Sequence, residues 1–232
     1  MAIEDLKTRD WVLLPGTLCT GDVFSGFLDT LGIPAERRVP VRLRLPEVES
    51  YAGVLGIVAD SAVLCGFSLG AIVAAHHADG LSAVRMVLFG LNPFPDDPAK
   101  AAGRRNLERD VLAEGGASAL SLRLPPLGGP DPDGARDTVL SMADVASEDI
   151  EAHTALALTR SGALGALSRS RSPVFVMTGS HDDMAQVSQG QAGADAAPFG
   201  RFRDIPDLGH YALLEDPVAC AQAFLELEDE VP

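Results

Sequence analysis

Short apolar runs separated by Gly, Pro or charged residues recur along the chain and predict the strands of a sheet. Most runs are continuous and not alternating, a pattern typical of strands that are covered on both faces. They occupy residues 11–14, 38–43, 62–65, 84–89, 174–178 and 201–205. The last run is more polar than the others, so we expect it at an edge of the sheet.

Helix-like segments lie between these runs, at residues 21–31, 51–60, 71–79 and 217–227. Strands that alternate with helices predict an α/β fold with a doubly wound, mostly parallel sheet, here of about six strands. A chain of 232 residues is long enough to bury the core of one such domain and to carry an insertion.

The alternation stops between residues 95 and 172, where the sequence contains no convincing strand. The pattern predicts one helix at residues 99–114 and a second at residues 147–160, with a Pro- and Gly-rich loop between them at residues 125–134. Ser147 is the predicted N-cap of the second helix. We therefore expect a core formed by residues 1–94 and 173–232 and a helical insertion formed by residues 95–172. The alternative is a peripheral helical layer that does not contact a substrate.

Ser68 stands at the centre of Gly66-Phe67-Ser68-Leu69-Gly70, between a predicted strand and a predicted helix. This is the pattern of a nucleophile elbow, in which the serine occupies a sharp and strained turn. Gly is needed at both outer positions because a Cβ atom would collide there with the neighbouring strand and helix. The turn places the serine oxygen at a helix N-terminus, where backbone N–H groups can stabilise a developing anion. The simpler alternative is a serine that only caps the helix.

A histidine and a pair of carboxylates follow Ser68 in an order that suits a catalytic triad. Asp182 and Asp183 lie in the loop after the fifth predicted strand, and His210 follows the last one. We predict His210 as the general base and one of the two carboxylates, Asp182 or Asp183, as the acid that orients it. Asp96, beyond another strand end, is the next candidate for the acid. The four other histidines lack this context: His76, His77, His153 and His181.

Four segments spread over nearly the whole chain carry motifs in a recognisable order. They are Leu13-Leu14-Pro15-Gly16-Thr17, the elbow, Gly179-Ser180-His181-Asp182, and Gly209-His210 with Glu215-Asp216-Pro217. In these segments the chain resembles the α/β-hydrolases, in particular the small enzymes of the esterase type. The resemblance implies that Asp182, the fourth residue counting from Gly179, is the acid, with Asp183 as the alternative. It also implies that the backbone N–H groups of Thr17 and Leu69 hold an oxyanion, and that the insertion forms a cap over the site. Pro15 departs from the commoner His-Gly pair, although related small hydrolases carry the same Leu-Pro-Gly.

On this resemblance, the chain is expected to hydrolyse a carboxylic ester or thioester through an acyl-enzyme on Ser68. Other functions stay open: acyl transfer or cyclisation, lyase or isomerase chemistry, and ligand binding with slow turnover. No metal or organic cofactor is expected, because the sequence has no His-x-x-Glu-His, Cys-x-x-Cys or phosphate-loop motif. The expected partner is a small acyl substrate, and the sequence indicates no oligomeric state.

The amino-acid composition limits the classes of partner and the cellular compartment that we expect. The 18 Lys and Arg residues and 33 Asp and Glu residues give a net charge of −15, which argues against nucleic acid or an anionic membrane as a partner. The three cysteines have no metal spacing, and there is no signal-peptide core or membrane-length apolar run, so we expect a cytoplasmic protein. Cys19 either lines the acyl pocket or is a buried structural residue. Acidic residues in the insertion leave a cationic substrate open: Glu108, Asp110, Glu114, Glu148 and Asp149.

Overall fold

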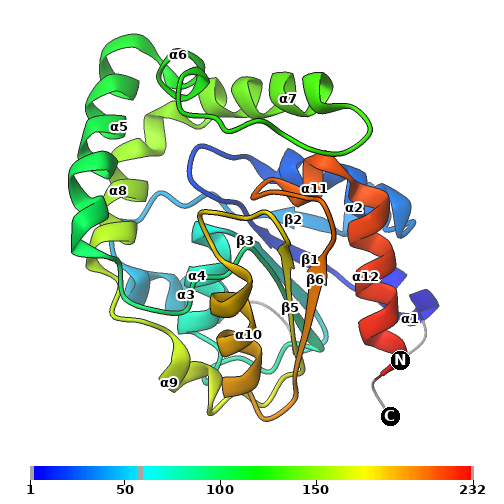
Figure 1. Ribbon diagram of the computed structural model, residues 1–232. Helices are drawn as coiled ribbons and strands as arrows, with labels where there is room; N and C mark the ends of the chain where they lie inside the picture. Colours follow the sequence, from blue (N-terminus) through cyan, green and yellow to red (C-terminus); the bar gives the residue numbers. More distant parts are fainter. Residues whose placement is uncertain (1–2, 57–59, 231–232) are drawn as a thin grey trace.

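Six strands form one sheet at the centre of the molecule, in the order β2-β1-β3-β4-β5-β6, with every neighbouring pair parallel (Figure 1). The computed structural model describes residues 3–56 and 60–230. The strands span Trp11–Leu14 (β1), Arg38–Pro40 (β2), Val63–Phe67 (β3), Arg85–Phe89 (β4), Val174–Gly179 (β5) and Gly200–Ile205 (β6). The predicted α/β fold is therefore confirmed, the sheet is parallel throughout, and β6 lies at an edge as expected.

Helices cover both faces of this sheet (Figure 1). On one face lie α1 (Ile3–Lys7), η1 (Gly21–Phe24), α2 (Ser25–Thr30), α11 (Ala212–Glu215) and α12 (Pro217–Asp229). On the other lie η3 (Val48–Ser50), α3 (Tyr51–Leu55), α4 (Leu69–His76), α9 (Leu164–Leu167) and α10 (Val187–Ala196). A short turn, η2 (Ala35–Arg37), precedes β2. Within the described ranges, no helix has both the length and the apolar character needed to cross a membrane.

Two hydrophobic cores lie on the two faces, because successive side chains of a strand point to opposite sides. In β1, Trp11 and Leu13 belong to one core, and Val12 and Leu14 to the other. Trp11 packs edge-on against Phe27 of α2, with the ring centroids 6.1 Å apart. Burial on both faces explains why the central strands read as continuous apolar runs.

The chain between β4 and β5 adds a group of helices that we call the helical segment (residues 95–172). It contains η4 (Pro98–Lys100), α5 (Ala101–Glu114), α6 (Gly116–Ser121), α7 (Pro132–Val145), η5 (Ser147–Asp149) and α8 (Ile150–Thr159), followed by α9. In Figure 1, α5, α6 and α7 lie beyond one end of the sheet and not against its faces. Val139 of α7 extends one core and Leu156 of α8 the other. The division of the chain into a core and a cap stays a prediction.

Three predicted features differ in the structure. The strand expected over 38–43 ends at Pro40, and Arg42 beyond it binds Asp149 of η5 at 2.8 Å. Ser147 is not an N-cap, because its hydroxyl donates to the carbonyl oxygen of Asp144 at 2.7 Å and α8 begins at Ile150. Of the helix predicted over 51–60, α3 ends at Leu55, and residues 57–59 lie outside the described residues.

The loops that follow β1, β3, β4, β5 and β6 meet at one edge of the sheet, because parallel strands all end on the same side. β1 and β3 are neighbours in the sheet, whereas β2 lies on the far side of β1. The strand order therefore reverses between β1 and β3, and a crevice opens at such a point in open α/β sheets. The loop with Thr17 and the turn with Ser68 flank this point.

Candidate active site

Ser68 occupies the turn between β3 and α4 with a left-handed backbone, φ 51° and ψ −115°. Residues other than glycine rarely adopt such angles, so the turn is strained. A Cβ atom at Gly66 would lie 2.7 Å from Cα of Ala71 in α4, and one at Gly70 would collide with the carbonyl oxygen of Leu14 in β1. Close backbone approach therefore requires both glycines, as the elbow pattern predicts.

Three side chains from three loops form a hydrogen-bonded series at this edge. Nε2 of His210 lies 3.0 Å from Oγ of Ser68, and Nδ1 lies 2.8 Å from Oδ2 of Asp182. The other carboxylate oxygen of Asp182 accepts from the backbone N–H groups of Met184 and Ala185, both at 2.8 Å. These bonds hold the Asp182 carboxylate toward the imidazole as an acceptor.

The two other acids considered for this role lie apart from His210. Asp183 is exposed, and its side chain makes no hydrogen bond or ion pair with another described residue. Asp96 binds Arg104 through two hydrogen bonds of 2.8 and 2.6 Å and lies 3.1 Å from a guanidinium nitrogen of Arg160. Of the three candidates, only Asp182 contacts His210.

Gly90, directly after β4, is a part of the site that sequence reasoning missed. It has a φ of 58°, and a Cβ atom there would lie 3.3 Å from Cε1 of His210 and 3.5 Å from Oδ2 of Asp182. On its other sides the imidazole packs against Phe67 and Tyr211, with centroid distances of 5.2 and 5.5 Å. The available signal was a glycine at the end of the strand that follows the elbow strand.

Two backbone N–H groups beside Ser68 have no acceptor among the described residues. Those of Thr17 and Leu69 donate no hydrogen bond to any described residue, and both residues line the cavity that contains Ser68. Leu69 begins α4, whose first N–H groups have no partner within the helix. Gly16 brings the Thr17 loop close, since a Cβ atom there would lie 3.1 Å from Cβ of Ser68. Free N–H groups in such a place can stabilise an oxyanion.

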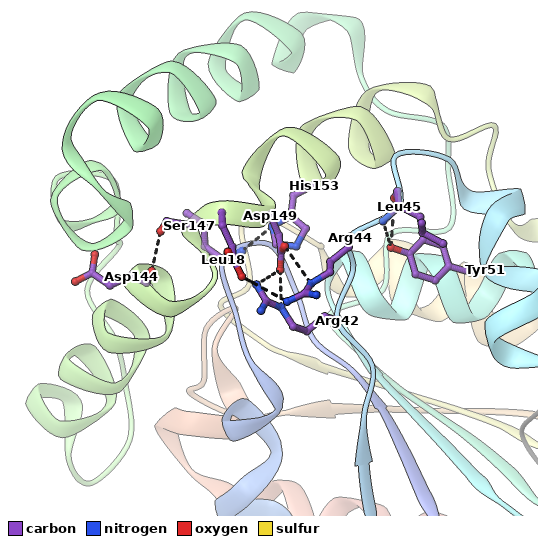
Figure 2. Close-up of polar contacts among 10 residues, drawn as sticks. Leu18, Arg42, Arg44, Leu45, Tyr51, Asp144, Ser147, Asp149 and His153 are labelled. Atoms are coloured by element: carbon purple, nitrogen blue, oxygen red, sulfur yellow. Dashed lines mark hydrogen bonds and ion pairs between the residues drawn. The ribbon is translucent and has the colours of Figure 1, made fainter.

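His153 of α8 holds the loop that contains Thr17 (Figure 2). Its Nδ1 accepts a hydrogen bond of 3.3 Å from the backbone N–H of Leu18, which has a φ of 54°. Burial lowers the pKa of His153 to about 4, while Asp149 acts to raise it and Arg42 to lower it. The imidazole is therefore neutral near neutral pH, as an acceptor nitrogen requires.

A cavity of about 100 Å³ lies over Ser68 and His210. The helical segment contributes six lining residues: Lys100, Arg104, Leu107, Leu120, Ala157 and Arg160. The segment therefore borders the space above Ser68. Cys19 does not, because it lines a different cavity, where burial raises the pKa of its thiol to about 12.

Three acidic residues of the helical segment bind arginines that lie outside this cavity. Asp110 pairs with Arg109 and Arg123, and both Glu148 and Asp149 pair with Arg42. None of the described Asp and Glu residues lines the cavity over Ser68. Across residues 3–56 and 60–230, no group of three or more His, Cys, Asp or Glu side chains is arranged to hold a metal ion.

Glu215 joins the helical segment to the loop of His210. Its side chain is buried, and Oε2 accepts from the backbone N–H groups of Gly128 at 2.9 Å and Gly209 at 2.8 Å. Oε1 has no hydrogen-bond partner among the described residues. One carboxylate oxygen thus positions both the loop before α7 and the residue before His210.

Comparison with known proteins gives one family and several similar structures. A sequence model described as "Alpha/beta hydrolase family" matches residues 11–223. An esterase from Thermogutta terrifontis, solved with malate bound, superposes with a TM-score of 0.79 at 21% identity, over 96% of this chain and 90% of its own. An enol-lactonase from Burkholderia xenovorans superposes with a TM-score of 0.75 at 19% identity, over 96% of this chain and 92% of its own. An esterase from a Rhodococcus species superposes with a TM-score of 0.71 at 18% identity, over 97% of this chain and 92% of its own. No curated protein matches the chain in sequence. At these identities the structural similarity shows the fold alone.

Proposed function

This chain belongs to the alpha/beta hydrolase family, and from that premise we propose that it hydrolyses a carboxylic ester or thioester of a small molecule, with Ser68 as the nucleophile. The family alone does not determine the reaction, because one fold can serve many chemistries. The observation that carries the proposal is the series from Ser68 through His210 to Asp182, with contacts of 3.0 and 2.8 Å.

The reaction proceeds in two half-reactions through a covalent acyl-enzyme. Nε2 of His210 takes the proton of Ser68 as its oxygen attacks the carbonyl carbon, and then gives this proton to the leaving alcohol or thiol as the C–O or C–S bond breaks. Water repeats the sequence and releases the carboxylic acid. The ionised carboxylate of Asp182 accepts a hydrogen bond from Nδ1–H of His210, which fixes the imidazole tautomer and stabilises the imidazolium.

The backbone N–H groups of Thr17 and Leu69 hold the negative charge that develops on the carbonyl oxygen. Neither group has an acceptor in the part of the chain that the structure describes. This supports the role, because donors already placed beside the nucleophile need little reorganisation during the reaction. The strained turn at Ser68 supports it too, since the helix that follows presents its free N–H groups to the same place.

Covalent labelling tests the proposal directly. A fluorophosphonate probe should modify the protein at Ser68, as read by mass spectrometry of its peptides. Ser68→Ala should lower kcat for an activated ester by at least about a thousandfold, because loss of a triad nucleophile is that severe. Ser118→Ala changes an exposed serine of α6 and is the matched control. Labelling of another residue, or near-normal turnover by Ser68→Ala, would contradict the proposal.

A further inference from the structure

Positive side chains are concentrated around the cavity over Ser68, in a protein that is strongly acidic. Lys100, Arg104 and Arg160 line the cavity, and none of the described Asp and Glu residues does. The chain as a whole has a net charge of −15, and Lys100 is one of its two lysines, with Lys7 the other. A cleft lined by one sign of charge attracts ligands of the opposite sign.

One carboxylate neutralises two of these cations. Asp96 binds Nε and Nη2 of Arg104 and also lies 3.1 Å from Nη2 of Arg160. Arg160 is enclosed, and its other nitrogens donate to the carbonyl oxygens of Phe94 and Ala157. Burial lowers the pKa of Arg160, yet a guanidinium stays charged in proteins. Two positive charges thus share one negative charge beside the cavity.

Two cationic donors are available to a ligand. Nη1 of Arg104 and Nζ of Lys100 have no partner within residues 3–56 and 60–230. The side chain of Arg104 is 29% exposed, and Lys100 is exposed where the cavity opens. Hydrogen bonds between such donors and a carboxylate are stronger than those between neutral groups. An entering carboxylate would also compensate the excess charge that the arginine pair leaves.

We propose that the substrate is an ester or thioester that carries a second group, a negatively charged carboxylate, which Arg104 and Lys100 bind. This inference rests on the proposed function, because it says which esters the cavity selects. It also replaces the cationic substrate that the sequence left open, since Asp110, Glu148 and Asp149 bind arginines elsewhere and none of the described Asp and Glu residues lines the cavity. If Arg104 only joined α5 to Asp96, its loss would slow all substrates alike.

Two matched pairs of esters that differ only in charge test the proposal by their kcat/KM values. Mono-para-nitrophenyl adipate and its methyl ester place the carboxylate on the acyl side. Para-carboxyphenyl acetate and its methyl ester place it on the alcohol side. We expect a preference of about tenfold to a hundredfold for the charged member of one pair, the range of a hydrogen bond to a charged group. The pair that shows it identifies which side of the ester the cations face.

Variants then connect this preference to the two side chains. Arg104→Gln and Lys100→Gln should each reduce it, the former by about tenfold or more. Arg105→Gln, an exposed neighbour on α5, and Lys7→Gln, on α1, should leave it unchanged. Where Arg104→Gln fails to fold because it leaves Asp96 with one partner fewer, the double variant Asp96→Asn, Arg104→Gln gives the same test.

The other outcomes of these experiments also support or overturn the proposed carboxylate site. Equal rates within both pairs, or a preference that Arg104→Gln and Lys100→Gln both keep, would overturn the proposal. If the wild type hydrolyses no ester, the proposed function fails, and calorimetry with adipate still tests the anion site. Adipate binding that Arg104→Gln weakens supports the site, and absence of binding to the wild type overturns it.

Discussion

Nδ1 of His153 accepts a hydrogen bond from the backbone N–H of Leu18 at 3.3 Å. Leu18 follows Thr17, so a side chain of α8 fixes the loop that supplies one proposed oxyanion donor (Figure 2). His153 would act as a positioning residue, because it orients the N–H group of Thr17 without contacting a reacting atom.

His153→Leu should lower kcat by about tenfold or more with a smaller change in KM, because an oxyanion donor acts mainly in the transition state. His153→Asn keeps a side-chain acceptor near the position of Nδ1 and should recover most of the rate. Steady-state kinetics on an activated ester, with circular dichroism to confirm folding, provides the measurement. An unchanged kcat in the leucine variant would exclude the positioning role, as would equal losses in both variants.

Stability should fall in mild acid, in part because of His153. Its pKa is about 4 in the folded protein against 6.5 for a free side chain. The unfolded state binds more protons between these values, so this contribution is fully present above pH 6.5 and is lost as the pH falls toward 4. The free energy of unfolding should drop by about 3 kcal/mol from this group across the window. Urea unfolding near pH 7 and near pH 4 measures this drop in the free energy of unfolding, which should be smaller for His153→Asn than for the wild type. An equal drop would contradict the assignment.

Asp182→Asn should lower kcat by about 10³- to 10⁴-fold, as for other triad acids. The amide oxygen would stay with the N–H groups of Met184 and Ala185, so the NH₂ group would face Nδ1 of His210 and favour the wrong tautomer. Asp183→Asn removes an exposed charge of the same loop and should cost less than about tenfold, which makes it the control. The reverse order of effects would move the acid to Asp183.

Gly90→Ala should lower both stability and activity. The left-handed backbone at Gly90 costs an alanine about 1–2 kcal/mol, measurable as a lower free energy of unfolding. The added methyl group would also crowd His210 and Asp182, and a shift of a few tenths of an ångström should reduce kcat on the order of tenfold. Gly53→Ala, in α3 with open space around it, is the control and should keep full activity. An active and stable Gly90→Ala variant would show that the site tolerates a side chain there.

The central strands of this fold are predictable because burial on both faces leaves a continuous apolar run in the sequence. Helices α7 and α10 could not be predicted from the sequence in this way. α7 begins at Pro132 inside a Pro- and Gly-rich stretch, where Asp131 caps it by accepting from the N–H of Gly134. α10 contains Gly190 and Gly193, which weaken helix propensity but allow close contact with β5 and with Leu91. Tertiary packing decides both helices.

The side chains of Ser68, Asp182 and His210 could be assigned to one candidate site from the sequence, because each follows a strand end in a recognisable turn. Gly90, His153 and Glu215 could not, because their roles depend on contacts between distant parts of the chain. His153 and Leu18 are 135 residues apart, and Glu215 and Gly128 are 87 apart. No local pattern encodes such pairs, so only the folded arrangement reveals them.

The shared carboxylate oxygen of Glu215 has a consequence for how molecules reach Ser68. If the helical segment swung away as a rigid lid, the bond to Gly128 would break and leave a buried carboxylate with fewer donors, which is costly. Lys100 and Met184, by contrast, are exposed where the cavity opens and can turn without disturbing the backbone. Entry and product release are therefore expected to follow side-chain rotation, on the picosecond-to-nanosecond scale, and not the far slower motion of a hinge.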